Sequence, residues 1–561
     1  MPEEPTAEPM RGRIDRLRAR AEDAAVAPRA TLRFGVYALV GLLVGLAVAA
    51  LQWVALDVVL HRLLDAPLWV QAVAPGTGLA ITMLVLRNRT SSSTSDEYIR
   101  AYHTGADLPP RELGPKMLAA VATLGLGGAM GAEGPSVYAG ASIGQRVGVL
   151  LPGVLGRRGH RTLTAAGVAA GVAAIFQAPA TGVLFALETP FQRDVARRAL
   201  IPALIAAATS YLTFTAIFDV HSYLPVPRGE VRLRDELLGA IVLGVCAGIA
   251  ARSLARLWSE AKALSSRLSP AIRLTIGAAV SALAFVAARG LTGVSFTLGP
   301  GTELVAGVAV DAELGLWVIA AAFLLRALAT SAALVAGGVG GSFIPLVVQG
   351  LLLGRLVESL FDGAAPGLYP AIGLAAVLGA GYRTPLAAVM FVAETTGQAQ
   401  YVIPALIATA VSQGVMGDKS VASYQVHERE GVLERRLRLP VRDAVIDVPS
   451  VHPDTPVTEV IDRYGDAPPA QALPVADDRY RGLLFLRDLA ATMFEQGPDA
   501  TVADAMHDVP AVRLDVPAVE AARLMGELDS AVIAVVDGDD HAVGIVTALT
   551  MTGVLEYDPD E

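Results

Sequence analysis

The chain has 561 residues, of which 53% are hydrophobic and 17% charged, with a mean hydropathy of +0.51 and a formal net charge of −10 at pH 7. A soluble chain of this length would carry more charge, so the composition excludes an ordinary soluble globular protein. The acidic balance gives no indication of nucleic acid as a partner, and the single cysteine, Cys246, excludes an internal disulfide framework.

Residues 1–30 form an N-terminal segment that we expect to lie in the cytoplasm. The segment starts acidic and polar and lacks the short apolar region of a signal peptide. Many arginines precede the first apolar run, and such an excess is typical of the cytoplasmic side of a membrane. These arginines are Arg11, Arg13, Arg16, Arg18, Arg20, Arg29 and Arg33.

Residues 31–417 are predicted to form a membrane domain. Several apolar runs in this stretch are long enough to span a bilayer. Glycine and proline interrupt many of them, and irregular backbone is tolerated at membrane depth only where protein or a water-filled cavity covers it. We therefore predict a multi-pass α-helical protein of the cell membrane, with broken helices in the lipid bilayer. The runs are 34–60, 68–86, 117–130, 200–218, 237–251, 274–288, 316–335 and 371–415.

A carboxylate stands in a glycine-rich stretch of this block. Residues 131–135 have the sequence Gly-Ala-Glu-Gly-Pro, and a helix is predicted to open at Pro135. Charge inside a bilayer is costly and usually functional. The glycines let backbone N–H groups approach a small ion, and a helix N-terminus carries partial positive charge. The stretch therefore predicts an anion site, with Glu133 as a tethered anion that can occupy or leave it.

The membrane block also contains an internal repeat. Residues 176–189 resemble residues 382–395, with proline, aromatic and glutamate positions in register at an offset of 206 (382 − 176). The glycine-rich segment that starts at Gly131 has a partner that starts at Gly338, an offset of 207 (338 − 131). The alternative is that apolar glycine-rich helices merely look alike, but the shared register favours a transporter built from two repeats, with its substrate site between them.

The composition changes after residue 417. Residues 418–440 are charged and are predicted to be a juxtamembrane linker, while 441–500 and 501–561 are predicted to be two copies of one β-α-β-β-α unit. Each copy alone buries little apolar surface, so we expect the two to pack together. Strands are expected at 471–477, 482–486, 531–537 and 544–547, and helices from 456, 488, 517 and 549.

Taken together, these motifs resemble the CLC family of chloride channels and proton-coupled chloride transporters, followed by a tandem CBS pair. Residues 131–135 and 341–345 (Gly-Ser-Phe-Ile-Pro) match two short family motifs in order and spacing. The resemblance implies a CLC-like inverted repeat and a homodimer with one chloride pathway in each subunit. We also expect both termini to be cytoplasmic and no cofactor to be required.

The resemblance also implies roles for individual residues. Glu133 would be the gating glutamate, and the backbone around Gly134, Phe343 and Ile344 would bind the anion. This agrees with the physical argument, because a fixed full positive charge would trap a halide, whereas helix-end charges and N–H donors let it leave.

The chain departs from the family in the loop that precedes the gating glutamate. Counting back aligns Ser92 with the family's anion-binding serine, and Ser93 and Thr94 are rivals, but the usual glycines and proline are missing from residues 91–98. The hydroxyls predict an inner anion site. They also suit a helix N-cap before Asp96, and both roles can hold at once.

Two further departures concern the inner gate and the proton path. Ala422 stands where we align the family's pore tyrosine, and the nearby Tyr424 is expected to pack structurally. Thr189 stands where proton-coupled members carry a glutamate, and threonine does not titrate near neutral pH. Glu188 is adjacent but faces another side of the helix, so a capping or paired role is favoured over proton transfer.

The CBS pair carries incomplete nucleotide motifs. The first copy has Asp488 in the ribose-binding place but lacks the preceding threonine, and the second has Thr547 but lacks the aspartate. The resemblance therefore leaves two readings open: an adenine-nucleotide sensor, or a dimerising cytoplasmic clamp without nucleotide.

Chloride permeation gated by Glu133, passive or weakly coupled to protons, is the function that we favour from sequence. The alternatives are chloride/proton antiport, export of fluoride or another anion, and a non-transporting sensor whose CBS pair binds a ligand. An enzyme is not expected, because metal-protease, nucleophile-elbow and phosphate-loop motifs are missing from the sequence.

Overall fold

The computed structural model describes residues 31–87, 90–152, 159–220, 233–310, 314–361, 367–428, 437–465 and 467–552. The N-terminal segment 1–30, with all six of its arginines, lies outside these ranges, as do residues 429–436 of the predicted linker. Contacts divide the chain into two compact units, Met1–Glu428 and Arg429–Glu561, which are described separately below.

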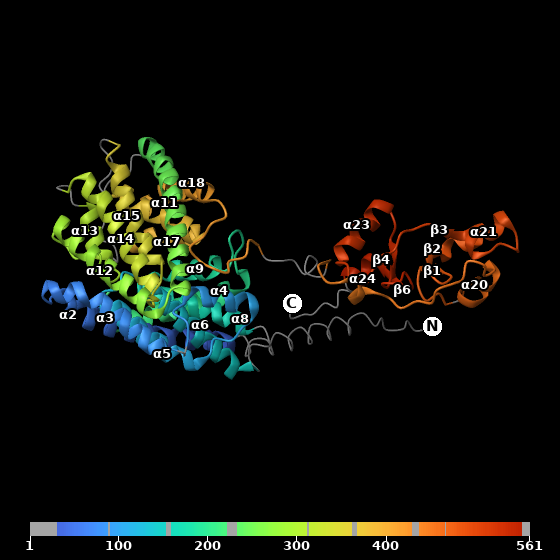
Figure 1. Cartoon of the computed structure of the whole chain (residues 1–561), viewed down its shortest axis with the longest axis horizontal. Helices are drawn as coiled ribbons and strands as arrows, with labels where there is room; N and C mark the ends of the chain where they lie inside the picture. Colours follow the sequence, from blue (N-terminus) through green and yellow to red (C-terminus); the bar gives the residue numbers. More distant parts are fainter. Residues whose placement is uncertain are drawn as a thin grey trace, which may run out of the picture. The chain divides into compact units, whose positions relative to one another are not determined.

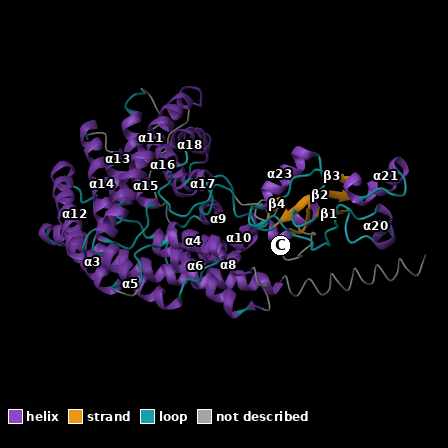
Figure 2. Ribbon diagram, turned by 45° about the vertical axis from the view of Figure 1, so that its right-hand side comes forward, coloured by secondary structure: helices purple, strands orange, loops and turns teal. Residues whose placement is uncertain are grey.

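The first unit is built from helices (Figure 2). Seven helices in the described ranges are long and apolar enough to cross a membrane, and shorter apolar helices lie between them, as the composition predicted. Leucine, valine and tryptophan side chains remain exposed on the outer helices, which suits a surface in contact with lipid. The seven are Thr31–Leu64, Leu68–Leu86 (α3), Arg197–Thr215 (η2 and α10, Leu200–Thr215), Glu236–Arg267 (within α11, Leu233–Arg267), Pro270–Thr292 (α12), Leu316–Ala336 (α14) and Ala399–Met416 (η3 and α18, Val402–Met416).

The shorter helices surround the glycine-rich stretches. They begin abruptly, several with proline in the first turn, where its missing N–H costs nothing. They are α4 (Ser95–Thr104), α5 (Pro110–Gly125), α6 (Glu133–Leu150), α8 (Gly159–Phe176), α9 (Pro179–Glu188), α13 (Thr302–Val310), α15 (Phe343–Glu358), α16 (Leu368–Tyr382) and α17 (Pro385–Thr396).

The internal repeat is visible in the backbone. The break between α8 and α9 and the break between α16 and α17 each contain one residue in the left-handed region, Gln177 (φ 50°) and Arg383 (φ 58°), which are 206 residues apart. Hydroxyls repeat as well: Ser210 donates to the Ala170 carbonyl (2.8 Å) and Ser412 to the Ala376 carbonyl (2.9 Å).

The repeat offset is not uniform along the chain. The helices after the two glycine-rich stretches begin at Glu133 and Phe343, so their offset is 210 (343 − 133) and not the 207 expected from sequence. The first helix also begins at Glu133, two residues before the expected Pro135, because helical geometry extends back through the glycine. The glycine pattern thus identified the two equivalent stretches but not which residues in them are equivalent.

Glycines on the repeated helices permit close backbone contact. A Cβ atom on Gly140 of α6 would collide with the Gly167 carbonyl of α8, and one on Gly350 of α15 would collide with the Gly373 carbonyl of α16. These two pairs allow α6 to pack closely against α8 and α15 against α16.

The second unit contains two small three-stranded sheets, orders β1-β2-β3 and β4-β5-β6 (Figure 1). Both hairpins are antiparallel, with Leu473 opposite Leu484 and Ile533 opposite Val546. The predicted strands and helices are present within a few residues, except that the first strand of the first copy is only a single bridge, Val451 to Val475. The elements are α20 (Val457–Tyr464), β1 (Ala472–Ala476), β2 (Tyr480–Phe485), α21 (Leu489–Gln496), α22 (Val502–Ala505), β3 (Met506–His507), β4 (Val512–Arg513), α23 (Ala518–Leu528), β5 (Val532–Val536), β6 (Ala542–Thr547) and α24 (Ala548–Thr552).

Candidate anion site

The two glycine-rich stretches meet in the centre of the first unit. Gly131 and Gly341 form an antiparallel pair in which each N–H donates to the other's carbonyl, at N···O distances of 3.0 and 2.8 Å. A Cβ atom on either glycine would overlap the Glu133 carboxylate. The pair therefore brings the positive N-terminal ends of α6 and α15 to one place and leaves room there for a small anion.

The Glu133 carboxylate occupies this place. The side chain is fully buried, and its Oε1 accepts from the Phe343 N–H at 2.7 Å and from the Ile344 N–H at 3.4 Å. Its Oε2 has no hydrogen-bond partner within the described chain. Charge-assisted bonds from the first amides of a helix offset part of the cost of burying the carboxylate. The amides named from the resemblance are thus the ones that hold Glu133.

Gly134 lies where the first stretch touches the second. A Cβ atom at this position would meet the Gly340 carbonyl and the Thr94 hydroxyl. The residue allows the two stretches to approach each other, and its position beside the carboxylate keeps it a candidate for anion contact.

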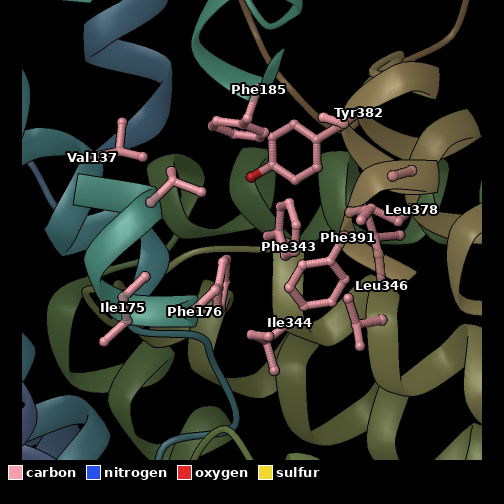
Figure 3. Close-up of a cluster of buried hydrophobic side chains, with 14 of the residues drawn as sticks. Val137, Ile175, Phe176, Phe185, Phe343, Ile344, Leu346, Leu378, Tyr382 and Phe391 are labelled. Atoms are coloured by element: carbon pink, nitrogen blue, oxygen red, sulfur yellow. The ribbon is translucent and has the colours of Figure 1, made fainter. Parts of the chain in front are cut away.

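An aromatic cluster packs around the amides that hold Glu133 (Figure 3). The Phe343 ring stacks on Phe176 at a centroid distance of 4.8 Å and meets Phe391 at 5.0 Å and Phe185 at 5.6 Å. The Tyr382 ring lies 6.4 Å from Phe343 and 5.6 Å from Phe185. These rings keep the surroundings apolar, which strengthens the attraction between the amides and an anion.

A cavity of about 230 Å³ lies beside the start of α15 and is rich in hydroxyl groups. Ser92 and Ser93, the sequence candidates for the inner site, both line it. The lining residues are Ser91, Ser92, Ser93, Thr94, Ser95, Asp96, Met130, Lys262, Ser265, Leu334, Gly338, Gly340, Gly341, Ser342 and Tyr382.

The expected side-chain cap on α4 is not formed. Thr94 is at the N-cap position, but its hydroxyl donates to the Gly340 carbonyl at 3.2 Å and makes no capping bond. The Ser91 hydroxyl bonds the Glu97 carboxylate instead. The capping interpretation is therefore wrong for Thr94 and Ser91, because their hydroxyls bond other segments. The first residues of α4 line the cavity.

Lys116 fixes this loop from behind, which sequence reasoning missed. Its side chain is fully buried in α5 and donates to the Glu97 carboxylate at 2.6 Å and to the Ser93 carbonyl at 2.8 Å. Arg326 of α14 does the same in the second half, donating to the carbonyls of Phe296 (3.1 Å) and Gly299 (2.8 Å). Both cations stand 17 residues before the start of the following glycine-loop helix (133 − 116; 343 − 326), a signal that the sequence does contain.

The candidates for the inner gate are arranged differently from the expectation. Ala422 is absent from the cavity lining, and its N–H donates to the Ser420 hydroxyl at 3.1 Å. Tyr424 was expected to pack, but it is 60% exposed and has a positive φ of 67°, which turns the chain outward. The tyrosine that lines the cavity is Tyr382, at the end of α16, and its alignment with Phe176 in the repeat is the signal that could have singled it out.

Glu188 caps a helix of the other half. Its two carboxylate oxygens accept from the Leu386 and Ala387 N–H groups at the start of α17, at 3.1 and 2.8 Å. Glu394 returns the same contact to α9, accepting from the Ala180 and Thr181 N–H groups at 2.9 and 2.8 Å. The pair of reciprocal caps is the arrangement that the favoured capping role of Glu188 requires.

Thr189 is buried and its hydroxyl donates to the Phe185 carbonyl of its own helix at 2.5 Å. Thr395, 206 residues later, bonds Phe391 in the same way. The hydroxyl is thus used within the helix, and the place of the family's proton-accepting glutamate holds no titratable group.

In the second unit the two nucleotide candidates have intramolecular partners. The Asp488 carboxylate lies 3.0 Å from His507 Nε2, and His507 also packs edge-on against Phe485. Thr547 exchanges hydrogen bonds with Thr550, which stands in the missing aspartate's place. The His507 contact thus uses one oxygen of the Asp488 carboxylate.

Comparisons with known proteins find matches to both units of the chain. Residues 77–417 match the sequence model of the voltage gated chloride channel family, and residues 441–495 and 501–555 each match the CBS domain. A ClcB-like chloride channel protein of Ralstonia nicotianae is 28% identical over 357 residues, which cover 61% of this chain and 81% of that protein.

Two further similar proteins are proton exchangers by name. The H(+)/Cl(−) exchange transporter ClcA of Vibrio parahaemolyticus is 25% identical over 379 residues, covering 64% of this chain and 80% of that protein. A solved CLC-type fluoride/proton antiporter is 25% identical with a TM-score of 0.61, and the alignment covers 71% of this chain and 98% of that one.

Proposed function

Since the chain belongs to the voltage-gated chloride channel family and carries a tandem CBS pair, we propose that it moves chloride across the membrane through a pathway gated by Glu133, passively or with weak proton coupling. The observation that carries the proposal is the Glu133 carboxylate on the Phe343 N–H at 2.7 Å. An anionic side chain held by helix-end amides stands where a permeating anion would be held.

Gating follows from the chemistry of this contact. The ionised carboxylate competes with chloride for the Phe343 and Ile344 amides and blocks the pathway. Protonation removes its negative charge, weakens both bonds and frees the amides. Chloride then binds to partial charges and N–H donors, from which it can leave.

Weak coupling is supported by the residues near the end of α9. Thr189 bonds its own helix, and Glu188 is held by two amides of α17. Neither presents a free carboxylate to carry protons toward Glu133.

Chloride/proton exchange is the second candidate. It is favoured by two of the similar proteins, whose names describe proton-coupled transport. Exchange in this chain would need protons to reach Glu133 through water in the hydroxyl-lined cavity, because position 189 is threonine. The fluoride antiporter among these similar proteins makes fluoride the first alternative anion to test.

The assembly proposed is a homodimer in the cell membrane with both termini in the cytoplasm. The second unit would act as a clamp that modulates transport. The His507 contact to Asp488 favours the clamp without nucleotide over an adenine-nucleotide sensor.

Deleting residues 441–561 should leave a dimer that is stable in detergent and that still shows measurable chloride flux. Complete loss of flux while the dimer stays intact would contradict a merely modulating role for the second unit.

The proposal is tested in liposomes that contain the full-length protein. A chloride gradient is imposed, and the voltage at which the current reverses is recorded with and without a pH gradient, then again with fluoride in place of chloride. A reversal voltage that follows chloride alone supports passive permeation. A shift with pH supports exchange, and flux of fluoride without chloride would contradict the assignment of the anion.

A further inference from the structure

The loop before α13, residues 296–301, is the second-half counterpart of the loop before α4. Lys116 donates to the Ser93 carbonyl in the first loop, and Arg326 donates to the Pro300 carbonyl in the second, an offset of 207 (300 − 93). In each half the helix that follows begins two residues after the bonded carbonyl. These equivalent contacts establish which residues of the two loops correspond.

The second loop lacks the carboxylate that neutralises the cation of the first. Glu97 pairs with Lys116 at 2.6 Å, but the position 207 residues later is Leu304 (304 − 97), a partly buried hydrophobic side chain. Within the described ranges Arg326 bonds only backbone carbonyls and makes no ion pair. The Arg326 guanidinium is fully buried, and a buried charge is costly unless an opposite charge accompanies it.

Three buried donor groups at this place have no hydrogen-bond partner within the described chain. They are the Arg326 Nε, the Thr297 Oγ1 and the Thr302 Oγ1. Thr297 is 2% exposed and Thr302 is 6% exposed, so neither hydroxyl reaches bulk solvent. A buried donor left unbonded costs free energy, and three of them in one loop and its tether call for a bound acceptor.

The start of α13 lies directly against the guanidinium. A Cβ atom on Gly301, the residue before the helix, would lie only 3.1 Å from the Arg326 Nη1. Thr302 is the first residue of this nine-residue helix, whose N-terminal end carries partial positive charge. A full positive charge, a helix end and free hydroxyl donors therefore share one location, and together they favour an anion over a water molecule.

We propose that a monovalent anion such as chloride binds at the start of α13 as the counter-ion of Arg326, on the Arg326 Nε and the hydroxyls of Thr297 and Thr302. The anion takes the role that the Glu97 carboxylate has in the first half. The missing charge is that of one carboxylate, so a divalent anion would bring a second, uncompensated charge into the interior.

This site is separate from the amides that hold Glu133. Its ion stabilises the second half of the membrane unit and is not the ion that is transported. The inference therefore does not depend on the proposed function, and a protein that moved no chloride could still bind it here.

The direct test is crystallography of the full-length protein with bromide in place of chloride, because bromide gives an anomalous signal. A bromide peak within hydrogen-bond distance of the Arg326 Nε and the Thr302 Oγ1 would support the site. Density for water at this place, in crystals that show bromide elsewhere, would overturn it.

A second test measures thermal unfolding of the full-length protein in detergent as gluconate is replaced by chloride at constant ionic strength. Leu304→Glu supplies the missing carboxylate and should remove the part of the chloride stabilisation that the uncharged Leu304→Gln retains. Thr302→Val should raise the chloride concentration for half-maximal stabilisation about fivefold, the usual effect of losing one hydrogen bond. Thr275→Val is the matched control, because the Thr275 hydroxyl bonds its own helix, and should leave that concentration unchanged.

The two pairs of variants keep the test decisive if one of them folds poorly. Equal chloride dependence in Leu304→Glu and Leu304→Gln would overturn the counter-ion. Equal chloride dependence in Thr302→Val and Thr275→Val would overturn the assigned donors. Chloride flux in liposomes is measured on the same variants, and loss of the pH response in Thr302→Val would show that the bound ion belongs to the transport pathway, contrary to the proposal.

Discussion

The two halves of the membrane unit share a backbone plan and differ at the positions that touch the anion pathway. The helices that begin at Glu133 and Phe343 occupy equivalent places, yet one contributes the carboxylate and the other the amide that binds it. Glu188 and Glu394, in contrast, are equivalent in both position and role. The residues with the same role in both halves are therefore those that hold the helices together. The residues that differ between the halves are those at the candidate anion site.

The buried cations extend this comparison. Lys116 and Arg326 each tie down the loop before a short helix, α4 in the first half and α13 in the second. Lys116 does so with a carboxylate partner, Glu97, whereas Arg326 donates to backbone carbonyls. The first loop carries the hydroxyls of the cavity, so its tether also holds part of the cavity wall in place.

The largest expected effect comes from removing these tethers. Lys116→Met leaves the Glu97 carboxylate buried without its cation and should cost about 3–5 kcal/mol of unfolding free energy. Arg326→Met leaves several carbonyls without donors but also removes a buried charge, so we expect a smaller loss of about 3 kcal/mol. Lys262→Met, at a partly exposed pair, should cost less than about 1 kcal/mol.

Thermal unfolding of the purified variants in one detergent checks this order. The Lys116 variant should also alter chloride flux in any fraction that folds, because its loop lines the cavity. A larger loss for Arg326→Met than for Lys116→Met would show that the carboxylate partner is not what distinguishes the two tethers.

A smaller effect is expected from the reciprocal caps. Glu188→Ala and Glu394→Ala each free two helix N–H groups, which should cost about 1–2 kcal/mol. The losses should be similar, and neither change should remove the pH response of chloride flux. Thermal unfolding and flux are measured together, and if Glu188→Ala alone removed the pH response, Glu188 would be a proton carrier and the equivalence of the caps would fail.

The smallest expected effect lies in the second unit, whose carboxylates are exposed. Hydrogen bonds from Arg481 and from backbone N–H groups lower the pKa of Asp477 to about 2. A lowered pKa stabilises the folded form above the ordinary pKa of an aspartate, about 3.9, and this contribution is lost as the pH falls toward 2.

Limited proteolysis of the full chain over this acidic range follows the second unit. Asp477→Asn should remove a small part of its acid sensitivity, and Asp478→Asn, the neighbouring aspartate, should not. Equal behaviour of the two variants would show that the Arg481 contact contributes nothing measurable.

Much of this arrangement was available from the sequence, for physical reasons that can be stated. Apolar length and broken runs predicted the membrane helices, and the 206-residue register predicted two repeated segments. In the structure each segment contains one residue in the left-handed region, Gln177 and Arg383. Glycine beside a carboxylate predicted an anion site at Glu133. Each of these features depends on residues close together in the sequence or on a constant offset, so residue spacing alone was enough to predict it.

The rest depends on contacts between distant segments. The pairing of Gly131 with Gly341 sets an offset of 210 that no local pattern contains, and the capping role expected for Thr94 was lost to a carbonyl 246 residues away. Tyr382 enters the cavity from a helix that the C-terminal motif gave no reason to examine. Sequence patterns thus identified the two repeats, but the contacts between residues of different repeats could be seen only in the structure.

The central claim is that Glu133 is the gate, and the most direct test is chloride flux from liposomes as a function of pH for the wild type and Glu133→Gln. Acid should raise wild-type flux, because protonation releases the carboxylate from the Phe343 and Ile344 amides. Glu133→Gln should move chloride at every pH, keep its preference for anions, and lose the pH response. If Glu133→Gln kept the pH response of the wild type, the gate would lie elsewhere in the protein.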